Sequence, residues 1–243
     1  MPEFFAKTHH RNPSDPVNGP FQYAHSTDKH FFPWLGQHPE YLAAFGNYMA
    51  GYRQGKPSWM DEGFYPVRER LLHVHHNADV LLVDVGGGNG HDLVELKQKL
   101  PDLPGRLVLQ DKPEVIQSVD LPSGIEAQGH DFFTEQPVKG ARAYFLHSVL
   151  HDWDDVSCLK ILKQLKLAMR PDSKLLIHEL IVRNRGAQMS VTSMDWLMMA
   201  LGSVKERTEA DWMQLLGLAD FSVEKVWTVD QGTESLIEAV IKE

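Results

Sequence analysis

Five short apolar runs alternate with stretches of helical pattern between residues 80 and 182 of this 243-residue chain. The runs occupy residues 80–85, 106–111, 125–131, 141–149 and 173–182. Their length and their content of Val, Leu and Ile are typical of buried strands. Because strands that alternate with helices form mostly parallel sheets covered on both faces, the pattern predicts an α/β, doubly wound architecture. Two last runs, 221–229 and 234–242, bring the expected number of strands to seven.

The stretches with helical periodicity fill the remaining intervals of this region. They are 91–100, 113–119, 154–169, 192–202 and 208–219. Residues 1–36 are rich in Pro, Asn, His, Gly and aromatic side chains and show no sustained period, so we expect an irregular arm there. Helices are expected at 38–55 and 65–74. We therefore divide the chain into an N-terminal segment, 1–76, and an α/β domain, 77–243.

Composition limits the classes of function. The formal net charge of −9 argues against a nucleic-acid partner, which needs clustered Lys and Arg. Cys158 is the only cysteine, so no intrachain disulfide can form, and a reducing, cytoplasmic location is expected. The sequence has neither a secretory signal nor the roughly 18 consecutive apolar residues of a membrane span, so no membrane partner is expected.

A glycine-rich stretch, LLVDVGGGNGHDL, joins the first strand to the first helix of the α/β region. Gly86, Gly88 and Gly90 allow a tight turn and a close approach of a ligand to the backbone. The helix that follows favours a polar or anionic ligand group at its N-terminus. The spacing is G-x-G-x-G, which differs from the G-x-G-x-x-G of dinucleotide-binding proteins. A purely structural glycine turn remains the alternative.

Polar residues follow the next two strands as well. Asp111 ends the second strand, 21 residues after Gly90 (111 − 90), where an acid can accept hydrogen bonds from both hydroxyls of a ribose. Asp131 and Phe132 follow the third strand and can provide an acceptor for an adenine amino group and a face for its ring. A solvated carboxylate and a core phenylalanine are the alternatives. Ligands of open α/β sheets bind at this carboxyl edge.

The stretch LHSVLHDWDD contains two histidines four residues apart, His147 and His151. His147 lies in a strand pattern, where residues at this spacing are about 13 Å apart, so a shared metal ion is not favoured. A second histidine cluster, HVHH at 73–76, lacks a nearby acid or cysteine, and no metal site is predicted. Asp154 and Asp155 are typical of a helix start.

The sequence as a whole resembles the fungal and plant-type small-molecule O-methyltransferases, class I enzymes that use S-adenosyl-L-methionine. The matching stretches lie in order along almost the whole chain. They are FQYAHSTD, MAGYRQGKPSWMD, LLVDVGGGNGHDL, LQDKPEVI, GHDFF, YFLHSVLHDWDD, AMRPDSKLLIHELIV and MDWLMMALGSVKERTEADWMQLL. The resemblance implies a Rossmann-like sheet whose last strand is antiparallel, and a cofactor bound along the first four strand ends.

The resemblance also implies roles for individual residues. The cofactor residues are expected to be Asp84, Gly86, Gly88, Asp111, Asp131, Phe132 and His147. His151 is expected to be the general base, with Glu179 and Glu206 beside it. The expected reaction transfers a methyl group to a hydroxyl of an aromatic or polyketide-like secondary metabolite and leaves S-adenosyl-L-homocysteine.

The chemistry supports a histidine base. A phenol with a pKa of about 10 is mostly protonated at neutral pH, so a base with a pKa near 7 is useful. A carboxylate on the far ring nitrogen would fix the tautomer. Met and aromatic residues suit the wall of a cavity for a flat acceptor. The wall is expected to include Phe45, Met49, Trp59, Met194 and Met198.

The chain departs from the family in one large respect. Family members usually begin with a helical dimerisation domain, and this chain starts roughly where that domain would end, so 1–76 is expected to be a substrate-side cover. The homodimer that the family forms is then expected to be weakened or altered. His178 replaces an asparagine that is frequent in fungal members. Two alternatives remain: a non-methylating relative that binds the same cofactor, and a nicotinamide dehydrogenase, which the glycine spacing and the lack of a Tyr-x-x-x-Lys pair disfavour.

Overall fold

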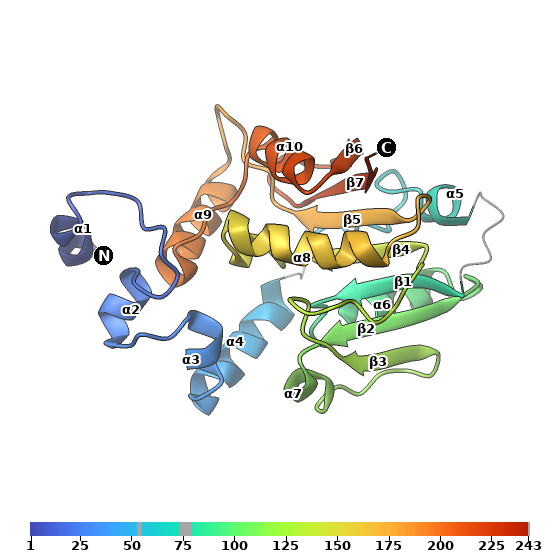
Figure 1. Cartoon of the computed structure of the whole chain (residues 1–243), viewed down its shortest axis with the longest axis horizontal. Coiled ribbons are helices and arrows are strands. Elements are labelled where there is room, and N and C mark those ends of the chain that lie inside the picture. Colours follow the sequence, from blue (N-terminus) through green and yellow to red (C-terminus); the bar gives the residue numbers. More distant parts are fainter. Residues whose placement is uncertain (53–54, 73–78, 243) are drawn as a thin grey trace.

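The computed structural model describes residues 1–52, 55–72 and 79–242 and has a seven-stranded sheet at its centre (Figure 1). The strands are β1 (Val80–Val85), β2 (Arg106–Asp111), β3 (Ile125–Gly129), β4 (Ala143–His147), β5 (Lys174–Glu179), β6 (Phe221–Trp227) and β7 (Ser235–Ile241). Their order is β3-β2-β1-β4-β5-β7-β6. Strands β1 to β5 pair in parallel, and β7 is antiparallel to both of its neighbours. The predicted doubly wound sheet with an antiparallel last strand is confirmed.

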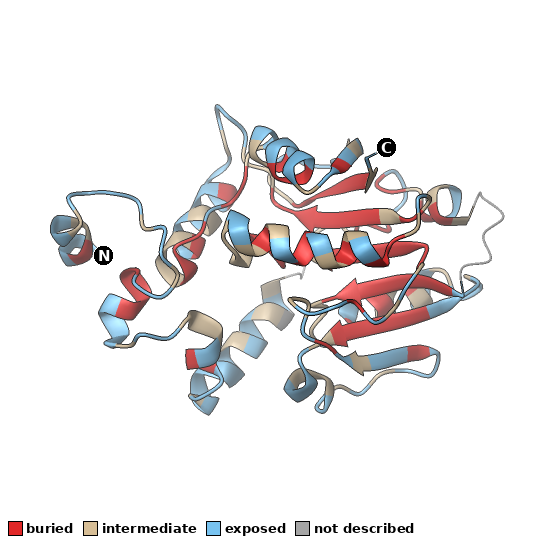
Figure 2. Cartoon of the chain, in the orientation of Figure 1, coloured by how far each residue is buried: buried red, intermediate tan, exposed pale blue. Residues whose placement is uncertain are grey.

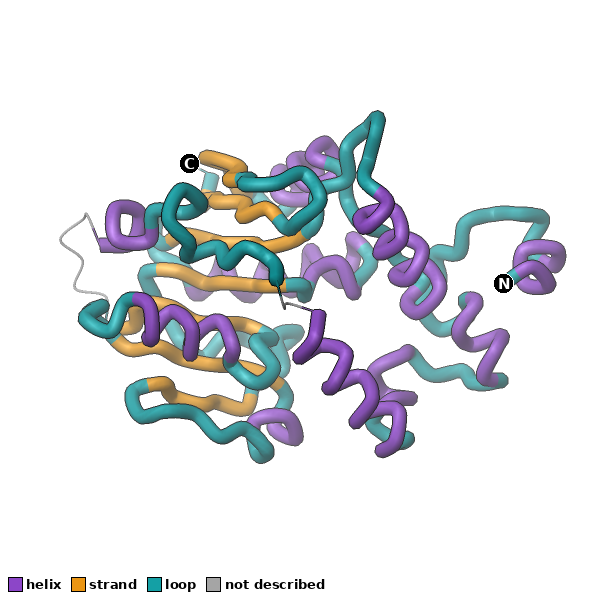
Figure 3. Tube along the Cα trace, turned by 180° about the vertical axis from the view of Figure 1, so that it is seen from behind, coloured by secondary structure: helices purple, strands orange, loops and turns teal. Residues whose placement is uncertain are grey.

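Helices cover both faces of the sheet (Figures 1 and 3). They are α5 (Val67–Leu72), α6 (His91–Lys99), α7 (Pro113–Ile116), α8 (Asp155–Ala168) and α10 (Glu209–Leu218). Side chains of a strand alternate between the two faces, so Tyr144 and Leu146 pack in the cluster with α8 and α10, whereas Ala143 and Phe145 pack with α5 and α6. The central strands are buried on both sides, as expected for a parallel sheet (Figure 2).

The N-terminal arm is more regular than the sequence indicated. Residues 1–36 form three short helices instead of an irregular segment: α1 (Pro2–Lys7), α2 (Pro20–His25) and α3 (Phe31–Leu35). Proline in the first turn starts α1 and α2, and the His30 side chain accepts the Phe32 N–H at the start of α3. These helices are too short to show a period, which explains the error. The expected histidine cluster at 73–76 lies outside the described residues.

The remaining helices lie beside the carboxyl ends of the parallel strands. Helices α2 and α3 pack with α4 (Pro39–Tyr52) and α9 (Met189–Gly202) around an apolar cluster that includes Phe21, Trp34 and Leu35. Figure 1, in which arrows give the direction of the strands, places this group at the end of the sheet to which the parallel strands point, and Figure 3 shows it beside one end of the sheet. Within the described residues, no helix has both the length and the apolar character that a membrane span requires.

The central position of β4 gives a stability prediction. Phe145 is fully buried, and its ring lies 4.9 Å from that of Trp59. We expect Phe145→Ala to lower the free energy of unfolding by about 3–5 kcal/mol, because it removes buried apolar surface and leaves a cavity. The exposed Leu167 on α8 is the control, since Leu167→Ala is expected to change stability by no more than about 0.5 kcal/mol. Urea unfolding followed by circular dichroism measures both variants, and equal losses would contradict the packing described.

Candidate active site

The glycine turn after β1 is held against the end of β2. The backbone N–H groups of Gly86 and Gly87 donate to the carbonyl of Gln110 at 2.8 and 3.1 Å. Gly86 has a φ of +74°, and a Cβ there would lie 3.0 Å from the side chain of Val149. A glycine is required at this position, because the backbone conformation is left-handed and the chain that follows β4 packs directly against it. The turn therefore contacts the segment that carries His151.

Two of the predicted cofactor residues support the turn from different sides. The Asp111 carboxylate accepts the N–H of Gly88 at 2.8 Å and that of Lys112 at 2.7 Å. Burial raises the pKa of Asp111. Asp84 is fully buried, and a Cβ on Gly87 would overlap its carboxylate. Asp84 thus lies beneath the turn, whereas Asp111 is partly exposed at its rim.

The loop after β3 adds an aromatic wall near the same turn. Asp131 accepts the N–H of Phe133 at 3.0 Å, which fixes the loop. The Phe132 ring stands edge-on to Trp153, with 5.9 Å between ring centroids, and would lie 3.5 Å from a Cβ on Gly86. The structure therefore brings Gly86, Gly88, Asp111 and Phe132 to one edge of the sheet, as the order of the strands requires.

His151 lies in a single 3-10 turn, η1 (Leu150–Asp152), directly after β4. The buried Glu179, at the end of the neighbouring β5, accepts the backbone N–H groups of Val149, Leu150 and His151 with the one oxygen Oε1, at 3.0, 2.9 and 3.3 Å. The Nδ1 of His151 is 2.9 Å from Glu206 Oε1 and 3.7 Å from Glu179 Oε2. Glu206 thus orients the imidazole, and Glu179 holds the turn that carries it.

Glu206 reaches His151 because the segment between α9 and α10 folds back over η1. The N–H of Glu206 donates to Asp195 Oδ1 on α9 at 2.9 Å. The buried guanidinium of Arg207 donates to the carbonyls of Leu150 and Trp153 at 2.8 and 2.9 Å. Sequence reasoning missed Arg207, although an arginine beside a predicted site acid was a usable signal. It fixes the distance between the η1 turn and the segment that supplies Glu206.

The charges around His151 determine its protonation. Burial lowers the pKa of His151, but the negative charges of Glu179, Asp152 and Glu206 outweigh it and hold this pKa well above its ordinary value. Burial raises the pKa of Glu179 to about 7, and that of Asp152 to about 6. The cluster therefore retains a proton at neutral pH, and the imidazole becomes a base when this proton is lost.

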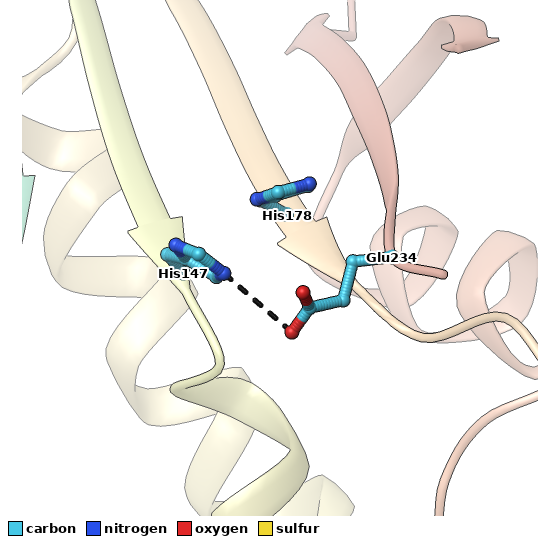
Figure 4. Close-up of side chains that lie close together, drawn as sticks. All are labelled: His147, His178 and Glu234. Atoms are coloured by element: carbon cyan, nitrogen blue, oxygen red, sulfur yellow. Dashed lines mark ion pairs between the residues drawn. The ribbon is translucent and has the colours of Figure 1, made fainter. Parts of the chain in front are cut away.

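His147, the last residue of β4, belongs to a second cluster of ionisable side chains, which is separate from that of His151. Its Nδ1 is 2.8 Å from Asp92 Oδ2, and its Nε2 is 3.5 Å from Glu234 Oε1. Figure 4 shows His147, His178 and Glu234 converging from three strand ends, and the His147 and His178 rings are 4.3 Å apart. Burial lowers the pKa of His147, but Asp92 and Glu234 raise it to about 10, so the imidazole is charged.

His147 and His151 lie in two separate clusters of ionisable side chains. Each cluster does contain side chains whose ligand atoms lie within 4.8 Å of one another. In both clusters, the direct pairing of an imidazole with a carboxylate explains why these ligand atoms lie close together. Asp92 and Glu234 could not be singled out from the sequence, because an acid in the first turn of a helix and a residue in the turn before β7 are ordinary surface residues until the fold buries them.

An apolar cavity of about 320 Å³ opens beside His151. Its lining includes four of the five residues expected in the wall, Phe45, Met49, Met194 and Met198. Trp59 is not among the lining residues. Its indole is fully buried on the face of the sheet that packs with α6, and its N–H donates to Asp92 Oδ1 at 3.0 Å.

The sheet, the glycine turn and a buried imidazole beside an apolar cavity define a methyltransferase-type α/β protein. The chain belongs to the family described as the O-methyltransferase domain, whose model matches residues 67–222. It is 46% identical over 245 residues to O-methyltransferase mpaG of Penicillium brevicompactum, covering 98% of this chain and 62% of that protein. The chain thus spans about three fifths of the length of such relatives.

Solved structures have the same fold. LepI in complex with SAM superposes with a TM-score of 0.92 at 31% identity, over all of this chain and 62% of that one. A structure titled "A Pericyclic Reaction enzyme" gives a TM-score of 0.90 at 31% identity, with 63% of that chain covered.

The charged His147 predicts a pH dependence of stability. Its pKa is about 10 in the folded protein and about 6.5 when unfolded, so its contribution is complete below about pH 6.5 and is lost as the pH rises towards 10. We expect the free energy of unfolding of the unmodified protein to fall by up to about 1.4 kcal/mol per pH unit more steeply than that of His147→Gln between pH 7 and 9.5. Chemical unfolding at several pH values measures this. Identical slopes would contradict it, and the exposed His91→Gln is the control.

Proposed function

We propose that this chain is the catalytic part of an S-adenosylmethionine-dependent O-methyltransferase that acts on a hydroxyl of an aromatic or polyketide-like small molecule. The observation that carries the proposal is the position of His151. It is buried, oriented by Glu206 and placed between the glycine turn and an apolar cavity. Such a base is suited to removing the proton of a phenol.

The residues at the sheet edge fit the cofactor. Asp111 has carboxylate oxygens suited to the ribose hydroxyls, and the backbone at Gly88 has open space beside it. Phe132 supplies an aromatic face, and Asp131 an acceptor, for the adenine. When bound, S-adenosylmethionine supplies a methyl group activated by a sulfonium. His147 remains a predicted cofactor residue, and its pairs with Asp92 and Glu234 hold its ring in position.

The acceptor hydroxyl would lose its proton to Nε2 of His151. In the neutral imidazole, Nδ1–H donates to Glu206, so Nε2 carries the lone pair. Glu206 then stabilises the imidazolium that forms, and Glu179 keeps the turn in place. The apolar cavity orients a flat acceptor and excludes water from the reacting oxygen.

A second candidate is a relative that binds the same cofactor without transferring the methyl group. The likeness to a pericyclic reaction enzyme favours this candidate. The intact set of His151, Glu179 and Glu206 favours methyl transfer. The mass of the product separates the two, because only methylation changes it.

The base gives a prediction for kinetics. With 2-naphthol as acceptor, His151→Gln is expected to lower the single-turnover rate of methyl transfer by about 10²–10⁴-fold, since general-base assistance is lost. The rate of the unmodified protein should rise with pH above neutrality, because the acids around His151 hold it protonated. Glu206→Gln should move this rise to lower pH, since it removes one negative charge beside the imidazole.

The exposed Glu209→Gln, three residues further on, is the matched control and should keep the original profile. Calorimetry with S-adenosylhomocysteine checks that each variant still binds the cofactor product. A His151→Gln protein that transfers methyl groups at the original rate would refute the assignment of the base.

A further inference from the structure

We propose that two hydroxyls held by Glu234 in the cavity lining, those of Ser148 and Tyr52, can only accept hydrogen bonds from a ligand, and that the acceptor molecule therefore carries a second hydroxyl next to the one that is methylated. This inference rests on the proposed function for the identity of the reacting hydroxyl. The hydrogen-bonding character of the cavity is a separate property, which binding alone can test.

Glu234 sets the direction of two hydroxyl groups in the cavity lining. Its Oε1 accepts from Ser148 Oγ at 2.9 Å and, in a longer contact of 3.4 Å, from Tyr52 Oη. Both Ser148 and Tyr52 line the cavity. A hydroxyl has one proton, so each of them has only lone pairs left for a ligand.

Glu234 is held in the ionised state that can only accept. Its side chain is buried, with His147 Nε2 3.5 Å from one oxygen and Lys56 Nζ 3.7 Å from the other. Burial would raise the pKa of Glu234, but the hydrogen bond and charge of His147 outweigh it and hold this pKa below its ordinary range. Burial and the neighbouring Glu234 raise the pKa of Tyr52, so its hydroxyl keeps its proton.

The adjacent part of the lining takes on the same character once His151 has lost its proton. Nδ1 of His151 is used by Glu206, so the neutral imidazole offers a lone pair, and Asp152 offers a carboxylate. Among the described residues, the other polar side chains of the lining are His30 and Tyr48, which belong to the N-terminal segment and can donate hydrogen bonds. His151 takes the proton of the reacting hydroxyl. A further donor on the acceptor molecule can then bond the lone pairs of Tyr52, Ser148 and Asp152.

The hydrogen-bonding character of these side chains limits which acceptor molecules can bind tightly. A carbonyl or methoxy oxygen at this end would face lone pairs and leave these half-buried acceptors without a donor, which weakens binding. A second hydroxyl would donate instead. The acceptor predicted by this geometry is an aromatic ring with two neighbouring hydroxyls, of which one is methylated.

The test uses three naphthalenes of similar shape: 2,3-dihydroxynaphthalene, 3-methoxy-2-naphthol and 2,3-dimethoxynaphthalene. Calorimetry on the whole chain saturated with S-adenosylhomocysteine gives the three affinities. The dihydroxy compound is expected to bind at least about tenfold more tightly than the dimethoxy compound, with the monomethoxy compound between them. Equal affinities, or tighter binding of the dimethoxy compound, would overturn the proposal.

Variants of individual side chains test which residues cause the preference for the dihydroxy compound. Glu234→Leu frees both hydroxyls to donate, so it should reduce or invert the preference for the dihydroxy compound. The double variant Ser148→Ala, Tyr52→Phe removes two acceptors and should weaken only the dihydroxy compound, which keeps the proposal testable if Glu234→Leu fails to fold. Tyr41→Phe, exposed on the same helix α4, is the matched control. A preference unchanged in the double variant would also overturn the proposal.

The same compounds separate this inference from the proposed function. Selective binding of the dihydroxy compound without any methylated product, when S-adenosylmethionine is supplied, would refute methyl transfer and support the cavity assignment. Methylation of 2-naphthol and of 2,3-dihydroxynaphthalene with equal kcat/KM would support methyl transfer and refute the second hydroxyl.

Discussion

One carboxylate oxygen, Oε1 of Glu179, joins the ends of β4 and β5 and holds the turn that carries His151. Burying a charged carboxylate is costly unless hydrogen bonds compensate for it. Here three backbone N–H groups do so, and His151 adds an opposite charge nearby. The same turn places Val149 against Gly86, so the position of the base and the shape of the glycine turn depend on each other.

This coupling extends outward to the cavity. Arg207 bonds the carbonyl of Leu150 in the η1 turn and fixes the segment that supplies Glu206. That segment connects α9, which lines the cavity, with α10, which packs on the sheet. On the opposite side, Glu234 connects His147 with Tyr52 at the end of α4. The two histidines of LHSVLHDWDD thus anchor two separate networks, and the cavity lies between elements that both networks hold.

The sequence predicts the fold well where burial dictates the pattern. The expected bounds of β1 and β2 coincide with the observed ones, because a strand covered on both faces contains a short, mostly apolar run that marks its position. The short helices of residues 1–36 were missed, since helices of five or six residues depend on packing around Phe21 and Trp34. The placement of His151 beyond the strand end could also be predicted from local pattern.

Long-range partners explain most of what could not be predicted at the site. Glu206 was predicted beside His151 only through the family resemblance, because nothing in the local sequence indicates that the chain folds back onto a residue 55 positions earlier. The pair of Asp92 with His147 joins residues that are also 55 apart, and Glu234 lies far beyond both. Trp59 looked like a cavity residue by its type alone, and the fold places it behind the sheet edge, where it bonds Asp92. The chemistry of each residue could be predicted from the sequence, but the positions of these residues relative to one another could not.

Methyl transfer to oxygen is tested most directly with a cofactor whose methyl group is deuterated. The chain is incubated with this S-adenosylmethionine and 2,3-dihydroxynaphthalene, and the products are identified by mass spectrometry. We expect one hydroxyl hydrogen to be replaced by a CD₃ group and S-adenosylhomocysteine to appear in equal amount. Recovery of the acceptor with unchanged mass, beside intact bound cofactor, would contradict it.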